Sequence, residues 1–520
     1  MIFVISLLLM VNSLGLGLLR LALKKFSFHW LLTLGVAVVV WILAILGRAS
    51  LPGEITLGEW QSPEMFIGTP GFILDEISWR LIVALTTLHL STLLVGGQEA
   101  GSARWRRWAG ISAYTAVGVL AVSAGNPLTL MMAWTGLDFL ELIIYLFYIS
   151  RDDQRQQVFR IIGVRLAGIF LVIAAGVYSS SGFAQLGFEH LGANVIYLVL
   201  IAAYLRLGIY PLAPPLFEDS SLRRSLGTIF RLVAASAALI PTLRVGPALQ
   251  ISGMGANWQA VWLIFTGSLA IYGGLAWFFS EDELTGRPGW VLGLASLSIA
   301  AAIGGMPASG LVWALALIFS GGLLFLADVR ERMSRWVVLL GGIGLTMLPF
   351  TPSWDGFRIF TLPSLPSKVL YILTISALIS GYFIKSNTAS RGHPAEENWI
   401  NIFYLSGLVL LPSTHFGLGI FQNVQRAESS FFSWFGRMAV LLLSFAGIYW
   451  RQRGGAAPRW MTGLLDAALS FRWLYALFRF SFSILNAIMS FVSQLIEGKG
   501  GVLWAILWLV IITIFLIIGL

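Results

Sequence analysis

The stretch LIAAYLRLGIYPLAPPL, residues Leu200 to Leu216, decides how this chain folds. It begins like a membrane span, but Arg206 lies within the apolar run and three prolines follow, the first being Pro211. An arginine at mid-membrane costs about 2.5–3.5 kcal/mol on insertion scales, and proline interrupts helical hydrogen bonding. The stretch therefore predicts a broken seventh helix, with Arg206 facing the interior of a helix bundle.

The rest of the sequence predicts an all-α integral membrane protein. Of 520 residues, 58% are hydrophobic and 11% are charged, too few to cover a soluble protein of this length. Sixteen apolar runs are long enough to cross a bilayer as helices. They lie near residues 2–22, 29–47, 77–96, 109–125, 127–150, 158–178, 194–213, 226–246, 259–280, 289–306, 308–327, 336–353, 367–386, 400–420, 432–450 and 501–519.

The distribution of basic residues predicts the orientation of these spans. With the N-terminus outside, most of the 33 Lys and Arg residues, Arg224 and Lys385 among them, fall in cytoplasmic loops, as in the positive-inside rule. The net charge of +9 thus reflects topology, and we expect no nucleic-acid partner. Residues 1–23 carry their positive charges after the apolar run, unlike a cleavable signal. We expect a multi-pass protein of a bacterial-type cytoplasmic (inner) membrane, in contact with the lipid bilayer.

A second proline pair repeats the feature of the opening stretch. Pro349 and Pro352 interrupt the twelfth span in LGGIGLTMLPFTPSW (Leu340–Trp354), five spans after the first break. Broken helices at corresponding positions of two halves are typical of inverted-repeat transporters with sites near the midplane. We expect three helices in residues 1–108, inverted five-helix repeats in 109–250 and 251–386, and helices 14 and 15 in 387–453.

Residues 454–500 predict a different element. Apolar residues from Leu464 to Ile496 recur at alternating steps of four and three, with polar residues between them. This pattern indicates an amphipathic helix with one apolar stripe, roughly 50 Å long, lying along the inner membrane surface. A C-terminal transmembrane helix in 501–520 is expected to follow it.

Charged residues within spans are the candidate functional residues. Asp138 and Glu141 lie mid-span in AWTGLDFLELIIYLF (Ala133–Phe147), three positions apart on one helix face. Thr135, one turn earlier, is expected to extend that face. Spans six, seven and eight carry the basic residues Arg165, Arg206 and Arg231. Together these groups predict either a functional charged line across the bundle or static ion pairs that hold helices together.

No cofactor and no metal site are expected. Cysteine is absent, which excludes disulfides, Cys-ligated iron–sulfur clusters and c-type haem attachment. The five histidines are scattered along the chain with no HxxxH spacing, and the sequence has no nucleotide loop or nucleophile triad. An independent enzyme is therefore the least expected class.

The layout resembles a known family. Sixteen spans, breaks in helices seven and twelve and a lateral helix before the last span resemble the largest antiporter-like subunit of respiratory complex I (NADH-quinone oxidoreductase), which is related to Mrp-type cation/proton antiporters. LRLGIYPL (Leu205–Leu212) resembles the family's KSAxFPLHxWLPDA, with Arg206 at the lysine and Pro211 at the proline. AGNPLTLMMAW (Ala124–Trp134) resembles the stretch that leads to the family's Trp-Glu pair.

The chain departs from the family at its titrating residues. Trp134 is followed by Thr135 where the family has glutamate, and Arg206 stands where the family has lysine. A buried lysine can lose its proton, whereas an arginine effectively cannot. The lysine of the family's eleventh helix is absent from LIFSGGLLFL (Leu317–Leu326). The chain is therefore identified as a degenerate member of the family.

The resemblance implies a membrane-arm subunit of a proton-translocating, NADH-quinone oxidoreductase-like complex, itself at most a non-catalytic proton-channel subunit. Asp138 and Glu141 would bind protons, and the three arginines would be fixed charges that set their proton affinity. The implied partners are other membrane subunits, with protons or sodium as the transported ion. The alternatives are a non-conducting structural paralogue, or a membrane partner of an energy-converting hydrogenase, an Mrp antiporter or a bicarbonate-uptake system.

Overall fold

The computed structural model describes most of residues 1–455 and short parts of the remainder. Outside the described residues lie 24–27, 58–68, 100–104, 150, 179–186, 189–190, 192–194, 210–216, 218, 252–255, 329–331, 388–397 and 421–430. Beyond 455 the described residues are 479–480, 483–484, 486–487, 490, 506 and 508–514. The chain divides into two compact units, Met1–Gly454 and Gly455–Leu520.

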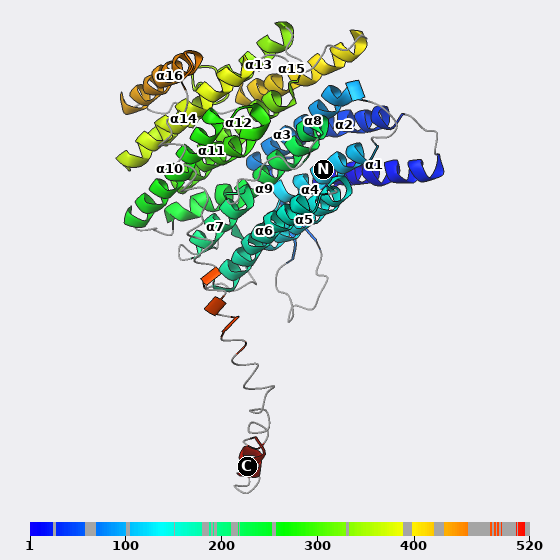
Figure 1. Ribbon diagram of the computed structural model, residues 1–520, viewed down its shortest axis with the longest axis vertical. Coiled ribbons are helices and arrows are strands. Elements are labelled where there is room, and N and C mark those ends of the chain that lie inside the picture. Colours follow the sequence, from blue (N-terminus) through cyan, green and yellow to red (C-terminus); the bar gives the residue numbers. More distant parts are fainter. Residues whose placement is uncertain are drawn as a thin grey trace. The chain divides into compact units, whose positions relative to one another are not determined.

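The first unit is a helix bundle whose members run roughly parallel or antiparallel to one another (Figure 1). Its earlier helices are α1 (Ile2–Ala22), α2 (His29–Leu46), α3 (Glu76–Val95), α4 (Trp105–Val122), α5 (Pro127–Tyr148), α6 (Asp152–Tyr178), α7 (Ile196–Leu207), α8 (Ser220–Arg224) and α9 (Leu226–Ile251). Its later helices are α10 (Ala256–Phe279), α11 (Glu283–Ile303), α12 (Pro307–Leu326), α13 (Arg332–Ile343), α14 (Leu365–Ser386), α15 (Asn398–Ile420) and α16 (Phe431–Gln452).

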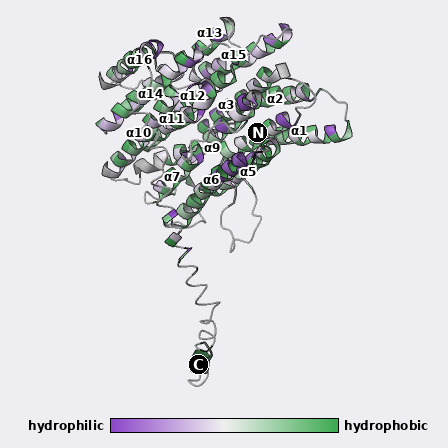
Figure 2. Cartoon of the chain, in the orientation of Figure 1, coloured by the Kyte–Doolittle hydropathy of each residue, from purple (hydrophilic) through white to green (hydrophobic). Residues whose placement is uncertain are grey.

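The expectation of an all-α membrane protein is confirmed. Eleven helices of the described residues are long and apolar enough to cross a membrane: α1, α2, α3, α5, α6, α9, α10, α11, α12, α14 and α15. Hydrophobic residues prevail along the bundle (Figure 2). The helices α7 and α13 are apolar but have only 12 residues each. The helices α4 and α16 lie at two of the expected spans but are not among the eleven candidate membrane helices. The count of sixteen spans and the inverted repeats stay predictions.

A small hairpin in the loop after α2 was not expected from the sequence. Strand β1 (Gly53–Thr56) pairs antiparallel with β2 (Gly71–Leu74), with Gly53 opposite Leu74. The Gly71 N–H donates to Thr129 Oγ1 at 2.8 Å. This bond ties the hairpin to the first turn of α5.

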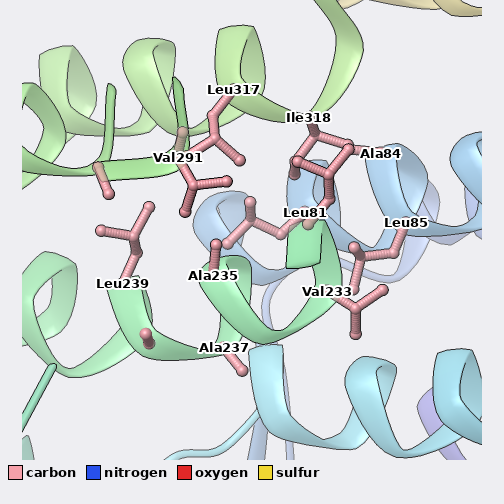
Figure 3. Packing of buried hydrophobic residues seen from close by; sticks show 14 of the residues in the cluster. Leu81, Ala84, Leu85, Val233, Ala235, Ala237, Leu239, Val291, Leu317 and Ile318 are labelled. Carbon is pink, nitrogen blue, oxygen red and sulfur yellow. The ribbon is translucent and has the colours of Figure 1, made fainter. Parts of the chain in front are cut away.

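The centre of the bundle is formed by α3, α9, α11 and α12. Figure 3 shows side chains of these four helices in contact, including Leu81, Val233, Val291 and Leu317. Their apolar windows are 89–100% buried, against 33% and 39% for α1 and α2. The four central helices therefore contact protein on all sides, while α1 and α2 leave one face to lipid.

Glycine permits a close contact between α10 and α11. A Cβ added at Gly273 would lie 2.5 Å from the backbone nitrogen of Gly293 and 2.8 Å from the carbonyl oxygen of Gly289. Small residues of this kind let helix backbones approach closely in membranes. At Gly273 the close approach is backbone against backbone.

The first expected helix break lies earlier than its proline. Helix α7 ends at Leu207, and Gly208 follows in the left-handed conformation with φ 79°. The N–H of Gly208 donates to Leu205 O and the N–H of Ile209 donates to Tyr204 O, which is the Schellman arrangement of a helix end. Pro211, which was expected to cause the break, lies outside the described residues.

The second break also precedes its proline. Helix α13 ends at Ile343, and Pro349 lies in a turn beyond it. The Ser353 hydroxyl donates to Gly344 O at 2.6 Å and accepts from the Met347 N–H at 3.1 Å, which holds this turn segment closed. The chain then forms a 3₁₀ helix, η6 (Trp354–Thr361), before α14 begins.

The second unit contains the expected lateral helix and last span, but most of both lies outside the described residues. Helical conformation is found at 479–480, 483–484, 486–487 and 490 within the expected amphipathic helix. It is also found at 506 and 508–514 within the expected span. Both elements stay predictions over the rest of their ranges.

Candidate functional site

One face of α5 carries the acidic residues of the candidate site. The helix starts where the Asn126 side chain accepts the Thr129 N–H at 2.8 Å, with Pro127 in the first turn. At 3.6 residues per turn, Trp134, Asp138 and Glu141 share one side of the helix. Asp138 and Glu141 are 2% and 1% exposed, although both are charged residues in an apolar helix.

Asp138 is bound by Arg206 from α7. Arg206 Nη1 donates to Asp138 Oδ2 at 3.0 Å, and Nη2 donates to Oδ1 at 3.1 Å, so both carboxylate oxygens are held. Nη2 also donates to the Trp134 carbonyl at 3.2 Å, and the guanidinium lies 4.7 Å from the centre of the Trp134 ring. Arg206 lies in the last turn of α7, where the helix dipole favours positive charge.

Glu141 is bound by Arg165 from α6. Arg165 Nη1 donates to Glu141 Oε2 at 2.6 Å and to Asp138 Oδ1 at 3.3 Å, so one nitrogen contacts both carboxylates. The Tyr114 hydroxyl on α4 donates to the same Glu141 oxygen at 3.0 Å. The charge cluster, defined as Asp138, Glu141, Arg165 and Arg206, is therefore one continuous network across α5, α6 and α7.

The other two candidates lie at the edge of the charge cluster or away from it. Arg231 on α9 is half-buried and forms no ion pair with Asp138 or Glu141, although it interacts electrostatically with Glu141. Thr135 is exposed, and its hydroxyl donates to Met131 O within α5 at 2.9 Å. The expectation that Thr135 extends the acidic face is not met, because it lies about 120° around the helix from Glu141.

The charge cluster is electrically balanced and closed to solvent. Two carboxylates face two guanidiniums, and all four side chains are at most 3% exposed. A buried ion pair is stable only when its geometry and hydrogen bonds offset desolvation, and here each carboxylate accepts at least two hydrogen bonds. Because arginine keeps its proton, only the two carboxylates can exchange protons in this network.

Sequence reasoning missed Tyr114, and it named Trp134 only for the family resemblance, although both complete the surroundings of the charge cluster. Nothing distinguishes a tyrosine in an apolar helix from an ordinary core residue. Only its position opposite Glu141 gives Tyr114 a polar role. The tryptophan carried a weak signal, since it stands four residues before Asp138 and hence on the same face.

Two basic residues assigned to loops are in fact buried. Arg224 pairs with Glu283 at 2.8 Å and with Asp328 at 3.0 Å, joining the ends of α8, α11 and α12. Lys385 donates to the carbonyls of Trp277 and Ser280 at 2.8 and 3.2 Å, at the C-terminal end of α10. Both were misplaced because a charge at a span boundary cannot be assigned to core or loop without its partners.

Within the part of the chain that the structure describes, no three His, Cys, Asp or Glu side chains gather as a metal-ligand group.

Solved structures share this fold, although no family model and no curated protein matches the sequence. A chain of the membrane-bound sulfane sulfur reductase, an archaeal respiratory membrane complex, is 12% identical with a TM-score of 0.66, over 99% of both chains. A chain of the Mrp complex from Dietzia sp. is 13% identical with a TM-score of 0.70, and the match covers 99% of this chain but 63% of that one. A chain of respiratory complex I from Thermus thermophilus is 15% identical with a TM-score of 0.62, over 85% of this chain and 100% of that one. The resemblance to antiporter-like subunits is thereby confirmed at the level of the fold.

Proposed function

We propose that this chain, which has the fold of the antiporter-like membrane subunits of complex I-like and Mrp complexes, is a membrane subunit of such a complex and contributes to proton translocation coupled to electron transport. The observation that carries the proposal is the charge cluster. Two carboxylates are buried in an apolar bundle within reach of two permanent positive charges. Ionisable groups within membrane helices are retained mainly where ions or protons move.

The geometry supports a mechanism in which ion pairing controls the proton affinity of the carboxylates. Arg206 and Arg165 hold the Asp138 and Glu141 carboxylates in ion pairs, and a neighbouring positive charge favours the charged form of a carboxyl group. Movement of Arg206 away from Asp138 would leave this buried carboxylate with the shared Arg165 contact alone, and loss of a paired charge in a desolvated site favours proton uptake. Return of the guanidinium would expel that proton. Arg206 suits this role because it lies at the end of α7, where displacement disturbs few helical hydrogen bonds.

Arg165 would transmit the change between the two carboxylates. Its Nη1 already contacts both, at 2.6 Å from Glu141 and 3.3 Å from Asp138. When Asp138 is protonated, Arg165 is free to bind Glu141 alone. When Asp138 is ionised, the guanidinium is shared between them.

A second candidate function is a non-conducting structural subunit of the same kind of complex. The observation that favours it is the complete charge balance of the cluster, whose two arginines cannot give up protons. Such a cluster would fix α5, α6 and α7 together without conducting. The same fold also fits an energy-converting hydrogenase, an Mrp antiporter or a bicarbonate-uptake system as the host complex, with sodium in place of protons.

Proton flux through the reconstituted full chain separates these functions. Proteoliposomes carrying a pH-sensitive dye would be driven by a potassium diffusion potential. We expect Asp138→Asn and Glu141→Gln to lower the flux about a hundredfold, the lower range for a positioned proton-transfer group. Glu76→Gln is the matched control, because Glu76 pairs with Arg80 at the half-exposed start of α3.

The conservative variant Asp138→Glu tests folding separately, since it keeps the charge and is expected to retain flux. Monodisperse elution of every variant in size-exclusion chromatography shows that it is folded. Flux of the wild type equal to that of protein-free liposomes, or equal flux in Asp138→Asn and wild type, would establish the structural subunit instead.

A further inference from the structure

An apolar groove runs between α1 and α2 on the outer face of the bundle. It has a volume of about 600 Å³ and is lined by Leu8 of α1 and by Leu32, Gly35, Val36 and Val39 of α2, with Phe28 at one end. Its lining is almost wholly apolar. The groove is separate from the charge cluster, which lies on α5, α6 and α7.

Gly35, one of the residues that line the groove, leaves open space along α2. A Cβ added at Gly35 would meet no atom within 4 Å, so the space in front of this residue is open. On the opposite side of α2, Leu34 and Ala37 are 7% and 1% exposed and pack into the bundle. The groove is thus a fixed feature of a helix whose other side is anchored.

The length of the groove corresponds to one leaflet of a bilayer. From Phe28 to Val39 a helix rises about 16 Å, and half of a hydrocarbon core is about 15 Å. A transmembrane helix of a partner would need about 30 Å, roughly twice this length. The dimensions therefore suit a lipid chain better than a partner helix.

Positive charge lies at the end of the groove that corresponds to the membrane surface. Arg20 is in the last turn of α1 and interacts electrostatically with His29, the first residue of α2. Basic residues beside a membrane surface attract anionic lipid headgroups.

We propose that the α1–α2 groove is a binding site for an anionic phospholipid. One acyl chain lies along Gly35 and Val36 between the two helices, and the phosphate lies against Arg20. The occupant comes from the leaflet on the Arg20 side of the membrane. Filling the groove at Gly35 should expel the lipid acyl chain. Neutralising Arg20 should remove only the preference for a negatively charged headgroup.

Photocrosslinking tests both parts of the site. The full chain is reconstituted in vesicles that contain phosphatidylglycerol or phosphatidylcholine with a photoreactive group at the end of one acyl chain, and the labelled peptides are identified by mass spectrometry. We expect labelling by phosphatidylglycerol to be concentrated on the peptides that contain Leu8 and Val39. Arg20→Gln should lower it about fivefold, the factor for loss of one basic residue at a membrane surface, with phosphatidylcholine labelling unchanged.

Gly35→Leu supplies the second arm. It should abolish labelling of both peptides by either lipid, and its Cβ would meet no atom within 4 Å. Gly417→Leu is the matched control, since a Cβ at this glycine of α15 also meets nothing within 4 Å. Labelling spread evenly over all lipid-facing helices, or unaffected by Gly35→Leu, overturns the site. Exclusion of lipid from the groove by a partner helix in the native complex also overturns it.

Discussion

Replacing Arg165 with methionine is expected to destabilise the protein by about 3–5 kcal/mol, the cost of removing one partner from a buried ion pair. The methionine keeps an unbranched, flexible side chain, but it is shorter than arginine and carries no charge. Asp138 keeps its two hydrogen bonds from Arg206 in this variant. Of the contacts described for Glu141, the Tyr114 O–H remains, so most of the cost arises from a poorly compensated Glu141 carboxylate.

A double-mutant cycle isolates this contribution. In Arg165→Met/Glu141→Gln the uncompensated charge is gone, and the double variant should be more stable than the sum of the single changes predicts. We expect a coupling energy of about 2 kcal/mol, within the range for residues in direct contact. The control is Arg151→Met, whose ion pair with Asp153 is more than 60% exposed and should contribute within about 1 kcal/mol.

The free energy of unfolding would be measured by steric trapping or denaturing-detergent titration in bicelles. A loss below about 1 kcal/mol for Arg165→Met, the value of an exposed pair, would refute the view that the cluster is a desolvated network. Strict additivity in the cycle would refute direct coupling between Arg165 and Glu141.

Further predictions concern other parts of the fold. Gly273→Ala should destabilise the α10–α11 contact by about 1–3 kcal/mol, as for overpacked cores, because its Cβ would meet backbone atoms. Gly417→Ala should not destabilise the protein, because a Cβ at this position lies in open space. Thermal melts in detergent would compare the two variants. Ser353→Ala should cost about 1–3 kcal/mol in the same melts, because it leaves a buried carbonyl and a buried N–H unpaired. Burial raises the pKa of Asp355 above its ordinary 3.8, so its contribution to stability is fully present below pH 3.8 and is lost as pH rises through the raised pKa. Asp355→Asn should remove this pH dependence. The measurement is the free energy of unfolding of wild type and variant below pH 3.8 and at neutral pH. A change with pH that is the same in both proteins would contradict the prediction.

The charge cluster was largely visible in the sequence, because a charge in an apolar span must find a partner within the protein. We expected Asp138 and Glu141 of the fifth span to meet the arginines of later spans. Arg165 and Arg206 form these ion pairs, whereas Arg231 is not a direct partner. Thr135 was placed wrongly because each step of three residues turns the helix face by about 60°. Two such steps place Thr135 about 120° from Glu141. The functional roles of these residues stay predictions.

Helix ends were less predictable than helix positions. Prolines predicted the breaks in the seventh and twelfth spans, but α7 ends at Leu207 and α13 ends at Ile343, before Pro211 and Pro349 in the chain. At α7 the end is fixed by a glycine that adopts a positive φ, with two backbone hydrogen bonds across it. A glycine within an apolar helix carries no such signal, since glycines are frequent in membrane helices.

The sequence alone determined that this chain is a multi-pass helical membrane protein with acidic and basic groups buried in its interior. Those conclusions follow from the transfer free energies of single residues, which do not depend on the partners that the residues find. The tertiary structure decided which guanidinium meets which carboxylate, that Tyr114 joins them, and that Arg224 and Lys385 are buried. Those outcomes depend on distances of a few ångströms between different helices, and such distances are set by packing of the whole bundle, which no single span encodes.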